Sequence, residues 1–264
     1  MTADTSVESC MRNVAAGQPA TDRVAAIREF LQRGANAFET VIPATDRPIV
    51  LDLSAGSRLG GEPLKGIDVD RFAALVERSM REAGTSIAYG RYAEPRDLYH
   101  TELFSSDVTG RAERRDVHLG IDVFCDAGTS VHTPLDGTVE IVANNKADLD
   151  YGPLLVLRHA SANGTPFYLL HGHLALHSIS SRRAGDRMAA GEKIAEVGAP
   201  PENGNWPPHL HLQVVTNLLG LGADFPGVAC RSQLAMWLQL SPSPAAFFPD
   251  CAAADLNHAL GDAA

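Results

Sequence analysis

Two short segments of the chain alternate polar, metal-ligating residue types with apolar ones. In VHLGIDVF, residues 117–124, His118 and Asp122 fall on one face of a predicted strand with Gly120 between them, because strand side chains point alternately to the two faces. The other face is an apolar stripe. Histidine and carboxylate are ligand types that zinc prefers. An exposed strand face would show the same alternation, so this segment alone leaves both interpretations open.

The segment HLHLQV, residues 209–214, repeats this alternation. His209, His211 and Gln213 face one way, and leucine and valine side chains face the other. Two imidazoles one pleat apart can reach a single cleft, although many such pairs lie on protein surfaces.

A third cluster is HGHLALH, residues 171–177. If the preceding strand continues, His171 and His173 share a face, again with a glycine between them. Of the 10 histidines, only His100 and His258 lie outside residues 118–211. Because the others recur beside apolar stripes, the three segments together predict a metal site more strongly than any one of them.

The secondary structure expected around these residues differs between the two parts of the chain. Residues 1–20 are expected to be disordered, and a helix is expected to begin at Thr21 or Asp22, either of which can cap it. A short strand is predicted over residues 48–53 and a second helix over residues 70–83, with Gly84 as its C-cap. This first part is mixed α/β and contains no visible catalytic constellation.

From residue 117 to residue 215 the pattern is one of short runs rich in valine, isoleucine and leucine between turn residues, which is typical of antiparallel β structure. Asp136-Gly137 predicts a hairpin, and two further strands are expected over residues 154–157 and 167–170. The predicted organisation has a mixed α/β segment at 1–100, a mainly β, barrel-like domain at 101–240 and a tail at 241–264.

Composition excludes several classes of protein. A formal net charge of -10 over 264 residues makes nucleic acid an unfavourable partner. The four cysteines form no C-x-x-C pair and are interpreted as free thiols. No signal peptide and no apolar run long enough to span a membrane is recognised, so we expect a cytoplasmic protein without membrane contact, exported only if an upstream segment is missing.

Two families of histidine-rich β proteins can be compared with these motifs. Cupins place a glutamate a few residues after His-x-His, and neither His173 nor His211 is followed by one. The chain instead resembles the M23 family of zinc metallopeptidases, the lysostaphin- and LytM-like endopeptidases. The resemblance covers roughly residues 115–215 and rests, in the family's order, on His118-x-x-x-Asp122, Gly128-Thr-Ser-Val131, Asp136-Gly-Thr-Val139, the strand ending in His159, His173-Leu174, Gly191-Glu-Lys-Ile194 and His209-Leu-His211.

This resemblance implies a fold, a cofactor and residue roles. The fold would be the antiparallel duplicated-hybrid-motif type, and one zinc ion would be bound by His118, Asp122 and His211. Three protein ligands suit a catalytic zinc, which keeps a fourth position for water. His173 and His209 would be the two catalytic histidines that do not bind the metal.

The chain departs from the family pattern at three places. His171-Gly172 replaces an aromatic residue, Asn205-Trp206-Pro207-Pro208 replaces a glycine-rich approach to the last motif, and Gln213 replaces a common glutamate. None of these changes removes a predicted ligand. The bulk of Trp206 and the stiffness of the prolines could reshape the substrate groove.

Other residues receive simpler interpretations. His159 is expected to have a structural or supporting role, and Cys125 is expected to be a small hydrophobic residue of the core. His171 is predicted to form the groove wall or to contact substrate, and Gln213 to hydrogen-bond near the site.

Three functional hypotheses follow. The first is a zinc endopeptidase or amidase acting on a peptide or amide, either peptidoglycan-derived or a small cytoplasmic molecule. The second is a non-catalytic or regulatory metal-binding module of the same fold. The third concerns the protein context of the chain. Residues 90–95 and 227–240 resemble the flanks of M23 modules fused to a phosphotransferase-like domain and a class-III aminotransferase. The oligomeric state is not indicated by the sequence.

Overall fold

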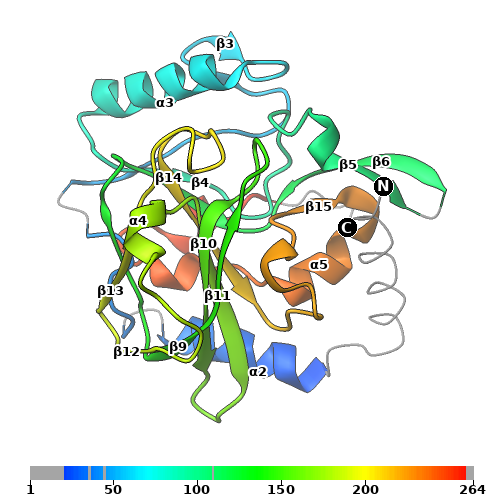
Figure 1. The fold of residues 1–264 in the computed structure, drawn as a ribbon. Helices are drawn as coiled ribbons and strands as arrows, with labels where there is room; N and C mark the ends of the chain where they lie inside the picture. The colour runs from blue at the N-terminus through cyan, green and yellow to red at the C-terminus, as the bar shows by residue number, and fades with distance from the viewer. Residues whose placement is uncertain (1–20, 35–36, 44–45, 109, 260–264) are drawn as a thin grey trace.

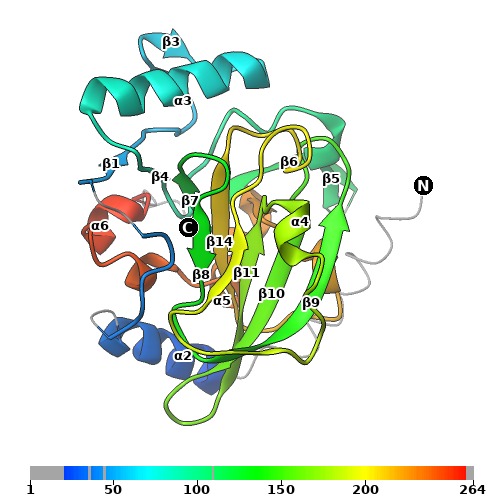
Figure 2. The same ribbon diagram turned by 60° about the vertical axis from the view of Figure 1, so that its left-hand side comes forward.

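The computed structural model describes residues 21–34, 37–43, 46–108 and 110–259 (Figure 1). The disorder expected for residues 1–20 falls outside these ranges. Figures 1 and 2 show a twisted sheet at the centre of the molecule, with α3 and the β2–β3 pair lying above it and α2 beside its lower part. Among the described residues, no helix has the length and apolar character needed to cross a membrane.

An eight-stranded sheet forms the centre, in the order β1-β4-β7-β14-β11-β10-β9-β12. All neighbours in it are antiparallel except β1 and β4, which are parallel. Its strands are β1 Ile49–Val50, β4 Ala88–Gly90, β7 Ile121–Phe124, β9 Gly137–Asn145, β10 Gly152–Ala160, β11 Pro166–Gly172, β12 Arg187–Met188 and β14 His209–Val215. The expected mainly β class is confirmed. The sheet ends at β1 and β12 and is not closed into a barrel within the described residues.

Three smaller sheets and several short helices surround this sheet. The smaller sheets pair β13 with β8, β15 with β6 and β5, and β2 with β3. Their strands are β2 Arg58–Leu59, β3 Glu62–Pro63, β5 Ser105–Val108, β6 Arg111–His118, β8 Ser130–His132, β13 Lys193–Glu196 and β15 Val228–Cys230. The helices are α2 Thr21–Gly34, α3 Val69–Ala83, α4 Leu176–Ile179, α5 Leu234–Leu240 and α6 Ala253–Leu256, with 3-10 turns η1 Glu102–Phe104, η2 Gly222–Asp224, η3 Arg231–Gln233 and η4 Ala245–Phe247.

Both helices predicted in the first hundred residues are present. α2 begins at Thr21, one of the two predicted starts. The side chain of Asp68 accepts a hydrogen bond from the Arg71 N–H at the start of α3, and Gly84 ends that helix in the left-handed conformation. The strand predicted over residues 48–53 is shorter, and only Ile49–Val50 pairs.

The hairpin predicted at Asp136-Gly137 is wrong. The strand before it, β8, pairs with β13, whereas the strand after it, β9, pairs with β10 and β12. The turn residues therefore redirect the chain from one sheet to another. The strands predicted over residues 154–157 and 167–170 do form an antiparallel pair, β10 with β11.

The first hundred residues contribute directly to the central sheet. β4 pairs with β7 in a register that places Gly90 opposite Asp122, and β1 extends the sheet beyond β4. The largest apolar cluster joins Ile27 and Leu31 of α2 to Ile121 and Leu212 of the central strands. The interior is thus continuous from α2 to the strands that carry the predicted site.

His171 lies in this interior, not in a groove. Its backbone partners in the sheet are Leu155 and Leu212, and its side chain is fully buried. Neither of its ring nitrogens has a hydrogen-bond partner among the described residues. Both roles predicted for His171, groove wall and substrate contact, are therefore wrong. His171 and His173 do not share a face, because β11 ends at Gly172 and His173 has a positive φ of 63° that breaks the strand alternation.

The burial of His171 predicts a pH-dependent stability. Burial lowers the pKa of His171 to about 3 in the folded chain, so the unfolded chain binds a proton below pH 6.5 that the folded chain does not. The free energy of unfolding should therefore fall as the pH falls from 6.5 toward 3. His171→Phe should flatten this dependence, raising stability at pH 5 relative to pH 7 by on the order of 1–2 kcal/mol. Urea unfolding at a series of pH values measures it.

A control variant tests whether replacing an exposed histidine changes the free energy of unfolding. His177 is exposed at 73% of its side chain, so His177→Ala should leave the free energy of unfolding at neutral pH within about 0.5 kcal/mol. An unchanged pH dependence in His171→Phe would contradict the interpretation.

Candidate metal centre and active site

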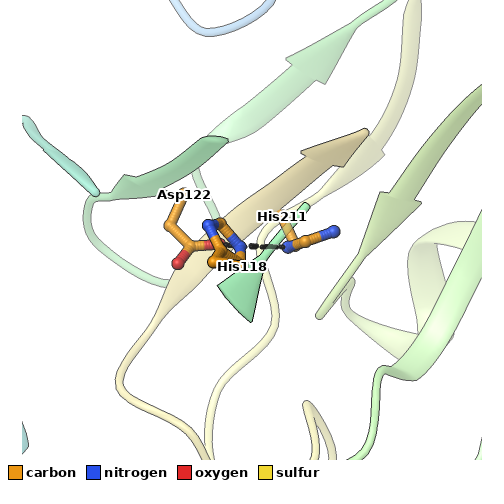
Figure 3. A group of neighbouring side chains, drawn as sticks. All are labelled: His118, Asp122 and His211. Atoms are coloured by element: carbon orange, nitrogen blue, oxygen red, sulfur yellow. Dashed lines mark hydrogen bonds and ion pairs between the residues drawn. The ribbon is translucent and has the colours of Figure 1, made fainter. Parts of the chain in front are cut away.

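Three elements bring the predicted metal ligands together. His118 ends β6, Asp122 lies in β7 and His211 lies in β14. The antiparallel register of β14 and β7 sets His211 directly opposite Asp122. Figure 3 shows the two imidazoles and the carboxylate converging on one point between these strands.

The converging atoms form a small triangle. Nε2 of His118 lies 2.9 Å from Nδ1 of His211, and each of these nitrogens lies 3.1 Å from Oδ1 of Asp122. All three side chains are buried, and these residues form a group whose ligand atoms could hold one metal ion. Ligands about 2.0–2.1 Å from a tetrahedral zinc lie roughly 3.3–3.4 Å apart, so small movements would adapt this triangle to zinc.

Hydrogen bonds on the far sides of the rings fix which atoms face the centre. Nδ1 of His118 lies 3.0 Å from the Arg91 carbonyl oxygen, which can only accept, so Nδ1 carries the proton. Nε2 of His211 lies 3.0 Å from Oε1 of Gln213, whose amide nitrogen donates to the Pro226 carbonyl. In the neutral rings, the nitrogens facing Asp122 therefore carry lone pairs.

This arrangement has a physical consequence. Burial and the nearby Arg96 lower the pKa of His118 to about 4, so this ring is neutral at pH 7. Unless a proton is shared between the two rings, two lone pairs and a carboxylate oxygen face one another at about 3 Å. Such a cluster repels itself without a cation, and the residues therefore fit a metal ion. The expected role of Gln213, hydrogen bonding near the site, is confirmed.

A buried ion-pair network holds the other side of Asp122. Arg96 donates from Nη1 to Oδ2 of Asp122 at 2.6 Å and from Nε to Oε2 of Glu94 at 2.9 Å. Arg96 and Glu94 are nearly inaccessible to solvent, at 3% and 0% exposed. Burial alone would raise the pKa of Asp122, but His118 and Arg96 outweigh it and hold that pKa well below its usual range. Asp122 is therefore a carboxylate with one oxygen committed to Arg96 and one free for the centre.

Sequence reasoning did not identify Arg96 or Glu94 as part of the site. Glu94 lies within residues 90–95 and Arg96 follows them, and this segment was predicted only to be a flank of the domain. The available signal was the pairing of opposite charges two residues apart, Glu94 and Arg96, within a stretch that also contains Arg91 and Asp97. That signal is weak, because such pairs are common on exposed surfaces.

His173 and His209 lie beside the triangle. Their ring centroids are 4.3 Å apart, and Nε2 of His209 is 3.7 Å from Oδ1 of Asp122. Nδ1 of His173 donates to the Asn203 carbonyl at 2.8 Å, and Nδ1 of His209 donates to the Pro207 carbonyl at 2.7 Å. Burial is the main cause that lowers the pKa of both rings. Each is therefore neutral with its Nε2 lone pair available to accept a proton.

One cavity joins all five residues. Its volume is about 980 Å³, and its lining includes the three residues of the triangle, His173 and His209. Trp206 also lines it, at the place where the sequence departs from the glycine-rich family pattern. A molecule that enters this cavity can reach the triangle and both neutral imidazoles.

The comparison with known families agrees with the motifs. The model described as Peptidase family M23 matches residues 116–219. The matched segment contains the triangle, His173 and His209, and ends shortly after β14. It matches the span of roughly 115–215 predicted from the motifs. None of the curated proteins compared matches the chain.

Solved structures with similarity to the chain include the following three. A zinc-containing peptidase from Vibrio cholerae is 29% identical over 40% of this chain and 28% of its own, with a TM-score of 0.30. LytU is 25% identical over 47% of this chain and 80% of its own, with a TM-score of 0.31. The catalytic domain of lysostaphin from Staphylococcus simulans is 18% identical over 56% and 90%, with a TM-score of 0.34. The chain thus spans little more than a quarter of the Vibrio structure.

The remaining predicted residues lie away from the triangle. His159 is buried in the core, where Nδ1 donates to the Asp136 carbonyl at 2.9 Å. Cys125 is buried among apolar side chains, and burial raises the pKa of its thiol to about 12, as expected for a small hydrophobic residue. Cys125, Cys230 and Cys251 are free thiols.

Gly120 keeps the centre open, as its place between His118 and Asp122 suggested. A Cβ atom at this position would lie 2.6 Å from Cε1 of His211 and 2.7 Å from the Leu212 carbonyl oxygen. We expect Gly120→Ala to displace the His211 ring and weaken zinc binding by at least tenfold, measured by competition with a chelator.

Gly164→Ala supplies the control for that measurement. Gly164 has a positive φ of 83° and open space around it, and it lies in the turn between β10 and β11, at the opposite end of β11 from Gly172, which pairs with His211, so alanine there strains the backbone away from the site. It should lower stability without changing zinc affinity. Equal zinc affinities in wild type and Gly120→Ala would contradict the role of Gly120.

Arg96 should act as a positioning residue for Asp122. We expect Arg96→Met to weaken zinc binding by about 10–100-fold, because Asp122 loses the partner that orients it. The matched control is Arg231→Met, which removes a solvent-exposed bond to Asp116 and should leave zinc affinity unchanged.

A double variant separates metal binding from folding. Arg96→Met leaves Glu94 buried without its main partner, which can unfold the chain. Arg96→Met combined with Glu94→Gln removes both charges and should fold better while still binding zinc weakly. Wild-type zinc affinity in the folded double variant would show that Arg96 does not position Asp122.

Proposed function

We propose that the protein is a zinc-dependent hydrolase that cleaves a peptide or amide bond. The observation that carries this proposal is the convergence of His118, Asp122 and His211, beside two neutral imidazoles, in one cavity. The match of residues 116–219 to Peptidase family M23 supports it independently. In this proposal His118, Asp122 and His211 bind one zinc ion, and His173 and His209 are catalytic.

The chemistry divides between the metal and the two histidines. Zinc, when bound, polarises the scissile carbonyl and lowers the pKa of a water molecule. Nε2 of His173 or of His209 accepts a proton from the attacking water, because both Nδ1 atoms are already committed to carbonyl oxygens. Once protonated, that ring can stabilise the developing oxyanion or return the proton to the leaving amine.

The hydrogen bonds to Asn203 and Pro207 orient these two rings. Each fixes a single tautomer, so neither ring must rotate before it can accept a proton. The left-handed backbone of His173 turns its side chain away from the core and toward the cavity. A residue other than glycine is held in such a conformation only when the surroundings favour it, and such positions cluster at functional sites.

The substrate and setting belong to the same proposal. A peptidoglycan-derived peptide would fit the activity named for lysostaphin, an antimicrobial peptidase. A small cytoplasmic amide is the other substrate class in this proposal. Two expectations stay predictions: the domain limits at residues 100 and 240, and a relation to fused transferase enzymes.

A second candidate is a non-catalytic or regulatory metal-binding module. The observation that favours it is the nearly complete burial of the triangle, whose three residues are at most 4% exposed. In this case the zinc would stabilise a surface that binds another molecule. Turnover of any peptide by the purified protein, abolished by chelation, would exclude it.

Three substitutions test the assignment of roles. His211→Ala should lose both zinc and hydrolysis, because it removes a ligand. His173→Ala and His209→Ala should keep zinc but lower kcat by about 10²–10⁴-fold, because they remove a proton acceptor. Zinc content is measured by metal analysis and hydrolysis on a panel of acylated dipeptide amides.

His177→Ala is the matched control. His177 lies in α4 with its side chain exposed, so its loss should change neither zinc content nor hydrolysis. The proposal fails if the wild-type protein binds no zinc, or if His211→Ala retains both zinc and activity.

A further inference from the structure

The cavity continues from the candidate metal centre into an aromatic pocket. We define this pocket by Tyr99, Phe104, Leu149, Trp206 and Val228, which form a separate apolar cluster of the interior and all line the cavity. Phe104 comes from η1 and Val228 from β15. The matched segment at residues 116–219 contributes Leu149 and Trp206, and the flanking regions contribute the other three.

Ring contacts connect this pocket to the proposed catalytic residues. Phe104 lies 4.9 Å from Tyr99, Tyr99 lies 6.2 Å from Trp206, and Trp206 lies 6.5 Å from His209, all between ring centroids. The Tyr99 hydroxyl also accepts a hydrogen bond from Nη1 of Arg96 at 3.2 Å. The pocket is therefore adjacent to the site, and Tyr99 connects it to Arg96, which binds Asp122.

The buried charged groups of this cavity are already partnered. Arg96 and Asp122 bind each other at 2.6 Å. Of the half-buried groups, Arg115 donates to the Leu103 carbonyl, and Asp150 accepts from the Tyr151 N–H at 2.7 Å. The other charged residues that line the described cavity, Glu102 and Asp224, are exposed. A charged group placed in the aromatic pocket would thus lose its hydration without gaining a free partner.

From this arrangement we infer that the site selects amides or short peptides with a bulky apolar side chain next to the scissile bond. The inference rests on the proposed hydrolase function and names its substrate class. Aromatic walls bind aromatic or branched aliphatic groups through burial of apolar area and offset ring contacts. A glycine at that position would leave the pocket unfilled, so glycine-rich peptides should be poor ligands.

The two tryptophans of the chain make this inference measurable. The sequence contains only Trp206 and Trp237, and both line the cavity. A ligand that fills the pocket should therefore change tryptophan fluorescence. The zinc-loaded full chain is titrated with N-acetyl-phenylalanine amide, N-acetyl-leucine amide and N-acetyl-glycine amide.

We expect the phenylalanine and leucine amides to bind at least tenfold more tightly than the glycine amide. The same order should appear with His211→Ala, since the pocket does not depend on turnover. Phe104→Ala should weaken binding of the phenylalanine amide about five- to tenfold by removing one wall. Equal affinity for the three amides, or unchanged affinity in Phe104→Ala, would overturn the inference.

A control variant and a second pocket variant keep the test decisive. Phe30→Ala removes a phenylalanine that packs against Phe38 and Phe167, away from the cavity, and should leave binding unchanged. If Phe104→Ala does not fold, Val228→Ala tests the same pocket from β15. Wild-type affinity in the folded variant would count against the inference.

Hydrolysis separates this inference from the proposed function. If the phenylalanine amide binds through the pocket but no peptide is cleaved, the pocket stands and the hydrolase proposal fails. If peptides with glycine and phenylalanine beside the scissile bond are cleaved with equal kcat/KM, the hydrolase proposal stands and the substrate inference fails.

Discussion

Electrostatic repulsion among three buried acceptors is the constraint on which this site depends. The lone pairs of His118 and His211 and the free oxygen of Asp122 meet at 2.9–3.1 Å. Water is largely excluded, so the repulsion is poorly screened. The fold keeps the three groups together through backbone pairing of β7 with β14 and through hydrogen bonds on the outer side of each ring. A metal ion is the partner that turns this repulsion into attraction.

The supporting residues come from regions outside the segment that resembles the peptidase family. Glu94 and Arg96 follow β4, the strand that extends the central sheet next to β7. The Pro226 carbonyl holds Gln213, which in turn holds His211. Flanking chain therefore completes the environment of the triangle and, through Tyr99, Phe104 and Val228, shapes the cavity beside it.

Histidine side chains occupy three different environments in this molecule. His118 and His211 direct lone pairs at a carboxylate, whereas His173 and His209 direct theirs into the cavity beside it. His171 lies among leucines, with no partner for either ring nitrogen within the described chain. The residue type is the same in each case, and only the groups around each ring determine whether it can bind a metal, accept a proton or fill the core.

The mainly β class, the start of α2, the end of α3 at Gly84 and the facing of His118, Asp122, His209 and His211 could be predicted from the order of residues alone. These features are local, since they depend on strand alternation, capping chemistry and motif order. Three features could not be predicted in this way: β8 and β9 lie in different sheets, His171 faces the core, and Arg96 binds Asp122. Those outcomes depend on which distant strands pair and on one left-handed residue at the end of β11, and neither is encoded in the spacing of neighbouring residues.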